Sequence, residues 1–197
     1  MKYIAVNAAV VGDSGAGKSR LLVAYSYGVH TANNVHPAMS CYVHDRVVDH
    51  HAVSLRLFDT SSGPNPNYDG LRISAYSHTD VIFICFSLVD PESYESVRTK
   101  WYPEISRHAP RAKILLIGTK VDLRDDLEVV EDLENRNLKP VTYQQGLAMC
   151  RDISAAGYFE CSACTGEGLG VVFEEGMRIA GASSRSSVGK RRSCIVF

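Results

Sequence analysis

The sequence lacks several features that define particular classes of protein. No apolar run approaches the roughly 18 residues that a membrane-spanning helix requires, and the longest candidate, residues 81–86, has the length of a strand. Neither charge dominates, because 21 Lys and Arg residues stand against 22 Asp and Glu residues, so no overall field attracts nucleic acid. The N-terminus has no apolar stretch followed by a small-residue cleavage site. We expect a soluble protein that is not secreted and does not bind nucleic acid.

The composition suits one folded domain. The 197 residues are 45% hydrophobic and 22% charged, which is enough for one sizeable core and excludes disordered, collagen-like and coiled-coil chains. The six cysteines are expected to be reduced, because a chain of this length without a secretory signal rarely relies on disulfides.

Two clusters of metal-ligating residue types have simpler interpretations. Cys161 and Cys164 form a CxxC pair, but no second pair stands at zinc-site spacing, so we interpret them as part of a loop. His50 and His51 follow Asp49 between two alternating runs, and His44 precedes them. This pattern is more typical of a hairpin turn than of a metal site.

Short apolar runs alternate with segments of helical length. The runs at residues 4–11, 53–58, 81–86 and 114–117 are rich in branched residues and predict buried strands. The segments at residues 18–27, 92–106, 143–152 and 169–179 predict helices. Residues 42–48 predict one antiparallel strand at the sheet edge, and a further strand-like stretch surrounds Tyr158. We therefore predict a three-layer α/β fold with a mostly parallel six-stranded sheet covered on both faces.

Two segments are expected to lie outside the core. Residues 125–139 are strongly charged, with a narrow apolar stripe of Leu127, Val130, Leu133 and Leu138, and predict a surface helix on the exterior. Residues 182–197 have no acidic residue and are rich in Ser and basic residues, a composition that cannot build a core. We expect a domain over residues 1–181 and a flexible basic tail after it.

A phosphate-binding motif follows the first predicted strand. Gly12-Asp13-Ser14-Gly15-Ala16-Gly17-Lys18-Ser19 matches GxxxxGK[ST] and precedes a predicted helix. The glycines allow backbone N–H groups to turn around an anion, and the helix adds its positive dipole end. Lys18 suits the β and γ phosphates and the Ser19 hydroxyl suits Mg²⁺. The alternative is a Gly-rich turn that binds no nucleotide.

Two further motifs point to guanine as the base. Thr119-Lys120-Val121-Asp122 follows a predicted strand at the edge where open α/β sheets bind ligands. The Asp122 carboxylate can accept from two guanine N–H donors, whereas adenine has no matching pair. Glu160-Cys161-Ser162-Ala163 follows another strand and offers backbone N–H groups to the guanine carbonyl.

These motifs together resemble the Rho family of the Ras superfamily of small GTPases, with Rac-type members most similar. The resemblance runs over residues 3–180, is strongest at residues 81–88 and 100–105, and places residues 125–139 at that family's insert helix. It implies that Ser14, Gly15, Ala16, Gly17, Lys18, Ser19 and Arg20 line the phosphates of GTP or GDP. It also implies that Lys120, Asp122, Leu123, Ser162, Ala163 and Cys164 surround guanine, and that Ser19 and Asp59 hold Mg²⁺.

The sequence departs from this family where the terminal phosphate is handled. Its second switch reads Asp59-Thr60-Ser61-Ser62-Gly63. Gly63 occupies the position of the Gln that orients the attacking water, so no catalytic residue is predicted there. Ser62 replaces a Gly whose N–H meets the γ-phosphate, and its Cβ restricts the backbone.

The first switch is altered as well. Pro37 or Ala38 aligns with the Thr that binds Mg²⁺ in the family, and neither has a hydroxyl, while Thr31 lies too far upstream. His30 replaces an aromatic residue that packs across the guanine, and Ser14 replaces a loop Gly. We expect nucleotide binding with slow hydrolysis; the alternative is that another group positions the water.

The chain ends in a motif for lipid attachment. Cys194-Ile195-Val196-Phe197 is a C-a-a-X box whose final Phe favours geranylgeranylation of Cys194. The basic run Lys190-Arg191-Arg192, with Arg185, supplies the second signal that stable anchoring needs. We expect a location on the cytoplasmic face of the plasma membrane or an endomembrane, with a cytosolic pool.

The functional hypothesis is a prenylated, monomeric Rho/Rac-like GTPase. The resemblance implies that its switch regions contact cytoskeletal or trafficking effectors, exchange factors and the dissociation inhibitor that binds prenylated relatives. The alternative is a non-hydrolysing module that recruits partners in one constitutive state. An ATP-dependent kinase with the same phosphate loop is not favoured, because the base motifs match guanine sites.

Overall fold

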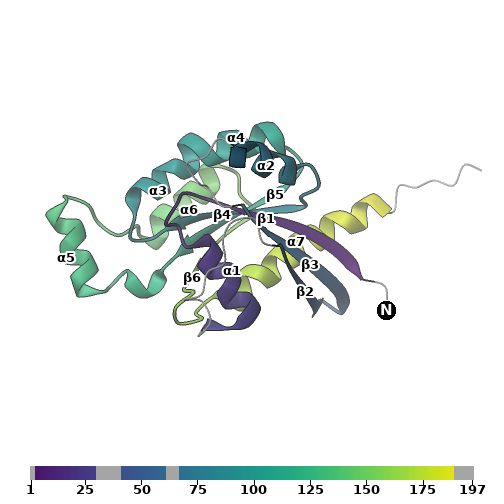
Figure 1. The fold of residues 1–197 in the computed structure, drawn as a ribbon, viewed down its shortest axis with the longest axis horizontal. Helices are drawn as coiled ribbons and strands as arrows, with labels where there is room; N and C mark the ends of the chain where they lie inside the picture. The colour runs from purple at the N-terminus through teal and green to yellow at the C-terminus, as the bar shows by residue number, and fades with distance from the viewer. Residues whose placement is uncertain (1–2, 30–40, 61–66, 189–197) are drawn as a thin grey trace, which may run out of the picture.

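A computed structural model describes residues 3–29, 41–60 and 67–188 of the chain (Figure 1). Its strands are β1 (Ile4–Val11), β2 (Cys41–Val48), β3 (His51–Asp59), β4 (Val81–Ser87), β5 (Lys113–Thr119) and β6 (Gly157–Cys161). Its α-helices are α1 (Lys18–Tyr27), α2 (Asn67–Tyr76), α3 (Pro91–Ser96), α4 (Tyr102–His108), α5 (Leu127–Asn135), α6 (Tyr143–Asp152) and α7 (Leu169–Val188). A π-helical turn, η2 (Val97–Trp101), joins α3 to α4, and a 3₁₀ turn, η3 (Val121–Leu123), follows β5. None of the described helices is both long and apolar enough to cross a membrane.

The strands form one six-stranded sheet in the order β2-β3-β1-β4-β5-β6. Every neighbouring pair is parallel except β2 and β3, which are antiparallel. The predicted fold class, with its single antiparallel strand at the edge, is therefore confirmed.

Two apolar clusters cover the two faces of the sheet. Alternate strand residues such as Phe83 pack with α1 and α7, while their neighbours such as Ile82 pack with α2, α4 and α6. This division follows from the two-residue period of side chains along a strand. The expected three layers are visible in Figure 1, with helices on both sides of the sheet.

The β2–β3 connection is a two-residue turn. β2 ends at Val48 and β3 begins at His51, and Asp49 and His50 between them have φ angles of 48° and 64°. Positive φ at both central residues is typical of the type I′ turn, whose twist matches that of the flanking strands. The prediction of a hairpin at this position is confirmed.

The helix predicted over residues 92–106 forms, but it includes a π-helical turn that the sequence pattern did not predict. Pro103 has no N–H to donate, and its ring would clash with a carbonyl in a regular α-helix. The preceding N–H, of Tyr102, bonds instead to the carbonyl of Val97, five residues back. The wider turn allows the chain to continue as a helix through the proline.

Two helices differ from the sequence-based expectation, and a third forms where it was predicted. α2 was not predicted, and α7 continues to Val188 although the pattern predicted its end at residue 179. α5 forms in the predicted charged segment and projects from the side of the body in Figure 1. Its apolar stripe is only partly packed, because Leu133 is 2% exposed but Leu127 is 84% exposed.

Candidate functional site

The phosphate loop lies at the carboxyl end of β1 and leads into α1. Its three glycines have positive φ angles, of 141° at Gly12, 83° at Gly15 and 80° at Gly17. A Cβ at Gly12 would stand 2.1 Å from the carbonyl oxygen of Cys85, so this position requires glycine for both space and conformation. The loop therefore has the backbone freedom that the motif predicted.

Lys18 begins α1 and is buried in the loop, with 6% of its surface exposed. Its Nζ donates to the carbonyl oxygen of Asp13 at 2.8 Å. Burial lowers the pKa of the ammonium, and the nearby Cys85, Asp59 and Asp13 oppose that effect. A buried cation at a helix N-terminus is a strong attractor for phosphate.

Asp59, at the end of β3, faces the start of α1. Burial raises the pKa of its carboxyl, while a hydrogen bond from Ser19 and the charge of Lys18 lower it. Its Oδ1 is buried and has no hydrogen-bond partner among the residues that the structure describes. A carboxylate oxygen without a donor beside a serine hydroxyl is the oxygen set that Mg²⁺ prefers, so these two residues fit the predicted metal role.

A cavity of about 150 Å³, called the base cavity below, lies next to the phosphate loop. The residues that line it come from α1, from the end of β5 with η3, and from the loop after β6. They are Gly17, Arg20, Leu21, Thr119, Lys120, Asp122, Leu123, Ala163 and Cys164. The structure therefore brings together the motifs predicted to bind guanine, which lie about forty residues apart in the sequence.

Thr119 connects the end of β5, which lines this cavity, to the phosphate loop. Its buried hydroxyl has one proton to donate, and two carbonyl oxygens are within hydrogen-bonding distance of it, that of Ala16 at 2.8 Å and that of Phe86 at 3.0 Å. Lys120 follows with a φ of 61°, a conformation that is costly for a residue with a side chain. The bend directs the chain into η3, where Asp122 and Leu123 line the cavity.

Ser162 stabilises the loop after β6 through hydrogen bonds to its backbone. It is fully buried, and its hydroxyl accepts from the backbone N–H groups of Cys164 and Thr165, both at 3.0 Å. Its side chain thus holds the loop in place, while Ala163 and Cys164 line the cavity.

An ion pair joins the end of η3 to β6 beside the base cavity, and the sequence did not predict it. Arg124 donates to both carboxylate oxygens of Glu160, with Nη1 at 2.8 Å from Oε2, and Tyr158 donates to Oε1 at 2.5 Å. Arg124 stands two residues after Asp122, and Glu160 stands two residues before Ser162. The pair therefore fixes the segment that carries Asp122 relative to the strand that leads into the loop after β6.

A second contact that sequence reasoning missed connects the phosphate loop with η2. Trp101 is fully buried, and its Nε1 donates to Oδ1 of Asp13 at 3.0 Å. Lys100 lies 3.5 Å from the same oxygen. The available signal was the chain's one Trp, because a buried indole N–H needs an acceptor.

Several predicted positions lie outside the described residues. They are His30, Thr31, Pro37 and Ala38 of the first switch, Ser61, Ser62 and Gly63 of the second switch, and Cys194 with its neighbouring basic residues Lys190, Arg191 and Arg192.

The sequence match agrees with this geometry. A family model described as the Ras family matches residues 7–181, which include the phosphate loop, the base cavity and all of the sheet except the first three residues of β1. The chain therefore belongs to the Ras family and is a small GTP-binding protein.

Proposed function

We propose that the chain is a Rho/Rac-like member of this family that binds GDP and GTP with Mg²⁺ and hydrolyses GTP slowly. The observation that carries the proposal is the contact of Thr119 with Ala16, which joins the base cavity and the phosphate loop into one continuous site. A nucleotide placed there meets Asp122 at its base and Lys18 at its phosphates.

Each side chain in the site has a definite task. Asp122 accepts from guanine N–H groups, and the αL bend at Lys120 keeps that carboxylate at the cavity wall. Lys18 and the phosphate-loop N–H groups neutralise the phosphates. Ser19 and Asp59 would hold Mg²⁺, which when bound neutralises charge on the β and γ phosphates.

Competition between nucleotides tests this binding role. A fluorescent GDP analogue bound to the purified full-length chain should be displaced by GDP and GTP but not by ADP or ATP, and nucleotide extracted from the protein should be guanine-based. Displacement by ATP at a concentration similar to that of GTP would contradict the proposal.

Slow hydrolysis follows from the second-switch sequence. Gly63 has no side chain to orient water, and phosphoryl transfer depends almost wholly on positioning and charge stabilisation. Hydrolysis of bound GTP in a single turnover should therefore be slow, and the double substitution Gly63→Gln with Ser62→Gly should accelerate it at least tenfold. An unaltered protein that already matches the double variant would refute slow hydrolysis.

The second candidate function is a non-hydrolysing module that presents one constitutive surface. It is favoured by the anchoring of α2: Arg72 is 4% exposed and donates to both carboxylate oxygens of Glu104, at 2.9 and 2.8 Å. Tyr76 donates to the same carboxylate at 2.7 Å. Hydrogen exchange in α2 that is identical with GDP and with a GTP analogue would support this module, and faster exchange with GDP would support switching.

The tail supports a membrane role. The C-a-a-X box at Cys194 and the basic residues before it combine a lipid with electrostatic attraction to an anionic leaflet. We accordingly place the working protein on the cytoplasmic face of a membrane. Effectors and exchange factors of the Rho type would contact its switch regions there.

A further inference from the structure

The phosphate loop carries a negative charge of its own, at Asp13. A carboxylate repels the phosphates that the loop is expected to bind, so its charge does not improve binding. The side chain of Asp13 is 24% exposed, and its Oδ1 lies 3.0 Å from Nε1 of Trp101 and 3.5 Å from Nζ of Lys100. Both partners belong to η2. The carboxylate is therefore engaged by an indole N–H and a cation of the protein itself.

Trp101 gives this contact a rigid support. The indole is fully buried in the apolar cluster that packs with α2, α4 and α6, on the opposite face of the sheet from α1. Cations also hold its ring, since the guanidinium carbon of Arg72 lies 5.2 Å from the ring centre and Nζ of Lys100 lies 4.5 Å from it. A hydrogen bond from the indole to a carboxylate is stronger than one between neutral groups.

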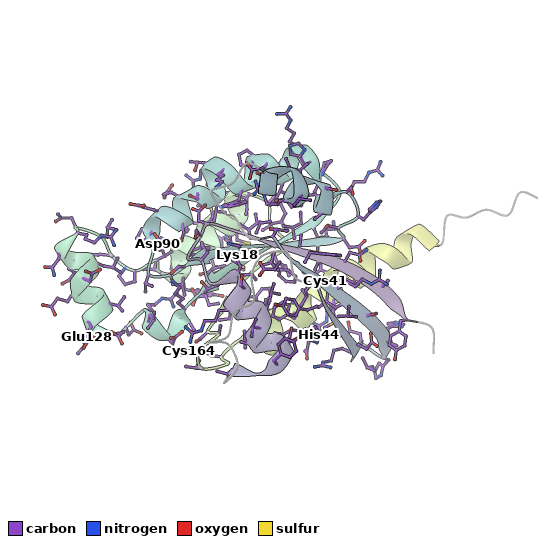
Figure 2. All side chains as sticks on the ribbon, in the orientation of Figure 1. Lys18, Cys41, His44, Asp90, Glu128 and Cys164 are labelled. Atoms are coloured by element: carbon purple, nitrogen blue, oxygen red, sulfur yellow. The ribbon has the colours of Figure 1, made fainter. Side chains whose placement is uncertain are left out.

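The backbone of Asp13 contacts the lysine that is expected to bind phosphate. The Asp13 carbonyl oxygen accepts from Nζ of Lys18 at 2.8 Å and from the backbone N–H of Ala16 at 3.2 Å. Figure 2 shows Lys18 at the start of α1, next to the sheet. A displacement of Asp13 would therefore also displace the Lys18 ammonium.

The phosphate loop is thus fixed at two points. Thr119 holds the carbonyl of Ala16 on the side of the base cavity, and Trp101 holds the side chain of Asp13 on the side of η2. The glycines of the loop have positive φ angles, and glycine loses more conformational freedom than any other residue when it becomes ordered. A loop that is ordered before the ligand arrives binds it without that loss of entropy.

We propose that Trp101 is a positioning residue for phosphate binding. Through Asp13 it holds the empty loop in the conformation that binds the diphosphate of the nucleotide, and Lys100 assists it. Because Trp101 is fully buried, it acts through Asp13 and not by contact with the ligand. This inference rests on the proposed function, because it requires a nucleotide whose phosphates bind at Lys18.

A double-mutant cycle tests the contact. Trp101→Phe keeps an aromatic ring but removes the N–H, and Asp13→Ala removes the acceptor. Each should raise the Kd for GDP about tenfold, and the double variant should bind no more weakly than the weaker single variant. Asp13→Asn keeps a carbonyl oxygen for the indole and should bind GDP within about threefold of the parent protein.

The outcomes of the cycle separate positioning from simple charge repulsion. If Asp13 only repels phosphate, Asp13→Ala will bind GDP more tightly than the parent protein, and the proposal fails. Full additivity of the two single variants would also overturn it. Since Trp101→Phe removes volume from the core, Asp13→Ala, in a half-buried loop residue, is the decisive variant.

Two cations of η2 provide a matched comparison. Lys100→Ala should raise the Kd for GDP about two- to threefold, because its partly exposed ammonium interacts with Asp13 through solvent-screened charge. Arg98→Ala removes a side chain that is 53% exposed, close to the 52% of Lys100, but that pairs with Asp152. It should leave the Kd unchanged, and equal effects of the two substitutions would contradict the role of Lys100.

Hydrogen exchange without nucleotide separates positioning of the loop from support of the fold. In Asp13→Ala the amides of residues 12–18 should exchange at least about tenfold faster, while those of β4 and β5 stay unchanged. Uniformly faster exchange across the sheet would mean that the contact only supports the fold. If the parent protein binds no guanine nucleotide, the proposed function fails; if it binds GDP and Asp13→Ala changes neither the Kd nor the loop exchange, only this inference fails.

Discussion

At the scale of single residues, the site contains charges that the fold alone does not favour. Lys18 is buried with its pKa lowered by desolvation, and Asp59 is buried with one oxygen that no donor in the described part of the chain satisfies. Such groups reduce the stability of the empty protein and become favourable when a ligand supplies the missing partner.

Asp59→Asn should therefore stabilise the empty protein. Burial raises the pKa of Asp59 in the folded state, so its protonation favours folding at low pH, and this contribution is lost as pH rises through the folded pKa. Urea denaturation without nucleotide or Mg²⁺ should give a free energy of unfolding at pH 7 that is about 1 kcal/mol higher for the variant than for the parent protein. The difference should shrink as pH falls towards 4.

A matched substitution distinguishes this effect from a general loss of negative charge. Asp125→Asn, at an exposed carboxylate, should leave the unfolding free energy unchanged at both pH values. Addition of GDP with Mg²⁺ should reverse the ranking, because Asp59→Asn removes the negative charge that attracts the metal. A variant that is less stable than the parent at every pH would contradict the account.

At the scale of elements, two bidentate ion pairs hold neighbouring segments together, one beside the base cavity and one between two helices. The Arg124–Glu160 pair joins the end of η3 to β6 beside the base cavity, and the Arg72–Glu104 pair holds α2 against α4. Both arginines hold their carboxylates through two nitrogens, which gives a fixed orientation that a lysine cannot reproduce.

Arg124→Ala should weaken the binding of GDP. Without the pair, the Asp122 loop and the loop after β6 lose their fixed separation, and we expect about a tenfold rise in the Kd for GDP. Arg124→Lys should recover little, because a single ammonium cannot replace the planar fork. Calorimetric titration measures both variants, and an unchanged Kd would show that the pair does not position the base site.

Arg72→Ala should destabilise the folded protein by about 3 kcal/mol, because it leaves the Glu104 carboxylate partly buried without its main partner. Arg98→Ala provides the comparison, since its pair with Asp152 joins side chains that are 53% and 54% exposed and should contribute less than about 0.5 kcal/mol. Urea denaturation measures both, and equal effects would contradict the role assigned to Arg72.

The elements that the sequence predicted well are those with a local signal. The buried strands follow from short branched runs, and the phosphate loop follows from glycines placed between a strand and a helix. α2 had no such signal: it contains Gly70 near its start and is held by Glu104, which lies on α4. The Asp13–Trp101 contact likewise joins residues 88 positions apart, beyond the reach of any local pattern.

At the scale of the whole molecule, the nucleotide site lies at the carboxyl ends of the strands, and the tail is proposed to carry the membrane anchor. All motifs predicted for the phosphates and the base that lie in the described residues meet at the carboxyl ends of β1, β3, β5 and β6. The family match over residues 7–181 covers this body and ends before the tail begins.

The tail should bind membranes through two signals, the lipid on Cys194 and the basic residues before it. Geranylgeranylated protein should bind vesicles that contain phosphatidylserine, and Cys194→Ser should abolish that binding. Replacement of Lys190, Arg191 and Arg192 by Ala should weaken it by about 3 kcal/mol, since each basic residue contributes about 1 kcal/mol near an anionic leaflet. Co-sedimentation measures the effect, and neutral vesicles serve as the control. Binding that persists in Cys194→Ser would contradict the anchor.

The central claim is that the site gains its binding energy from the guanine and the first two phosphates, with little from the third. Titration of the full chain with GDP and with a non-hydrolysable GTP analogue, both in Mg²⁺, tests this most directly. We predict dissociation constants that agree within about threefold. An analogue that binds more than about tenfold tighter than GDP would mean that the altered switches still grip the terminal phosphate, and would contradict the account.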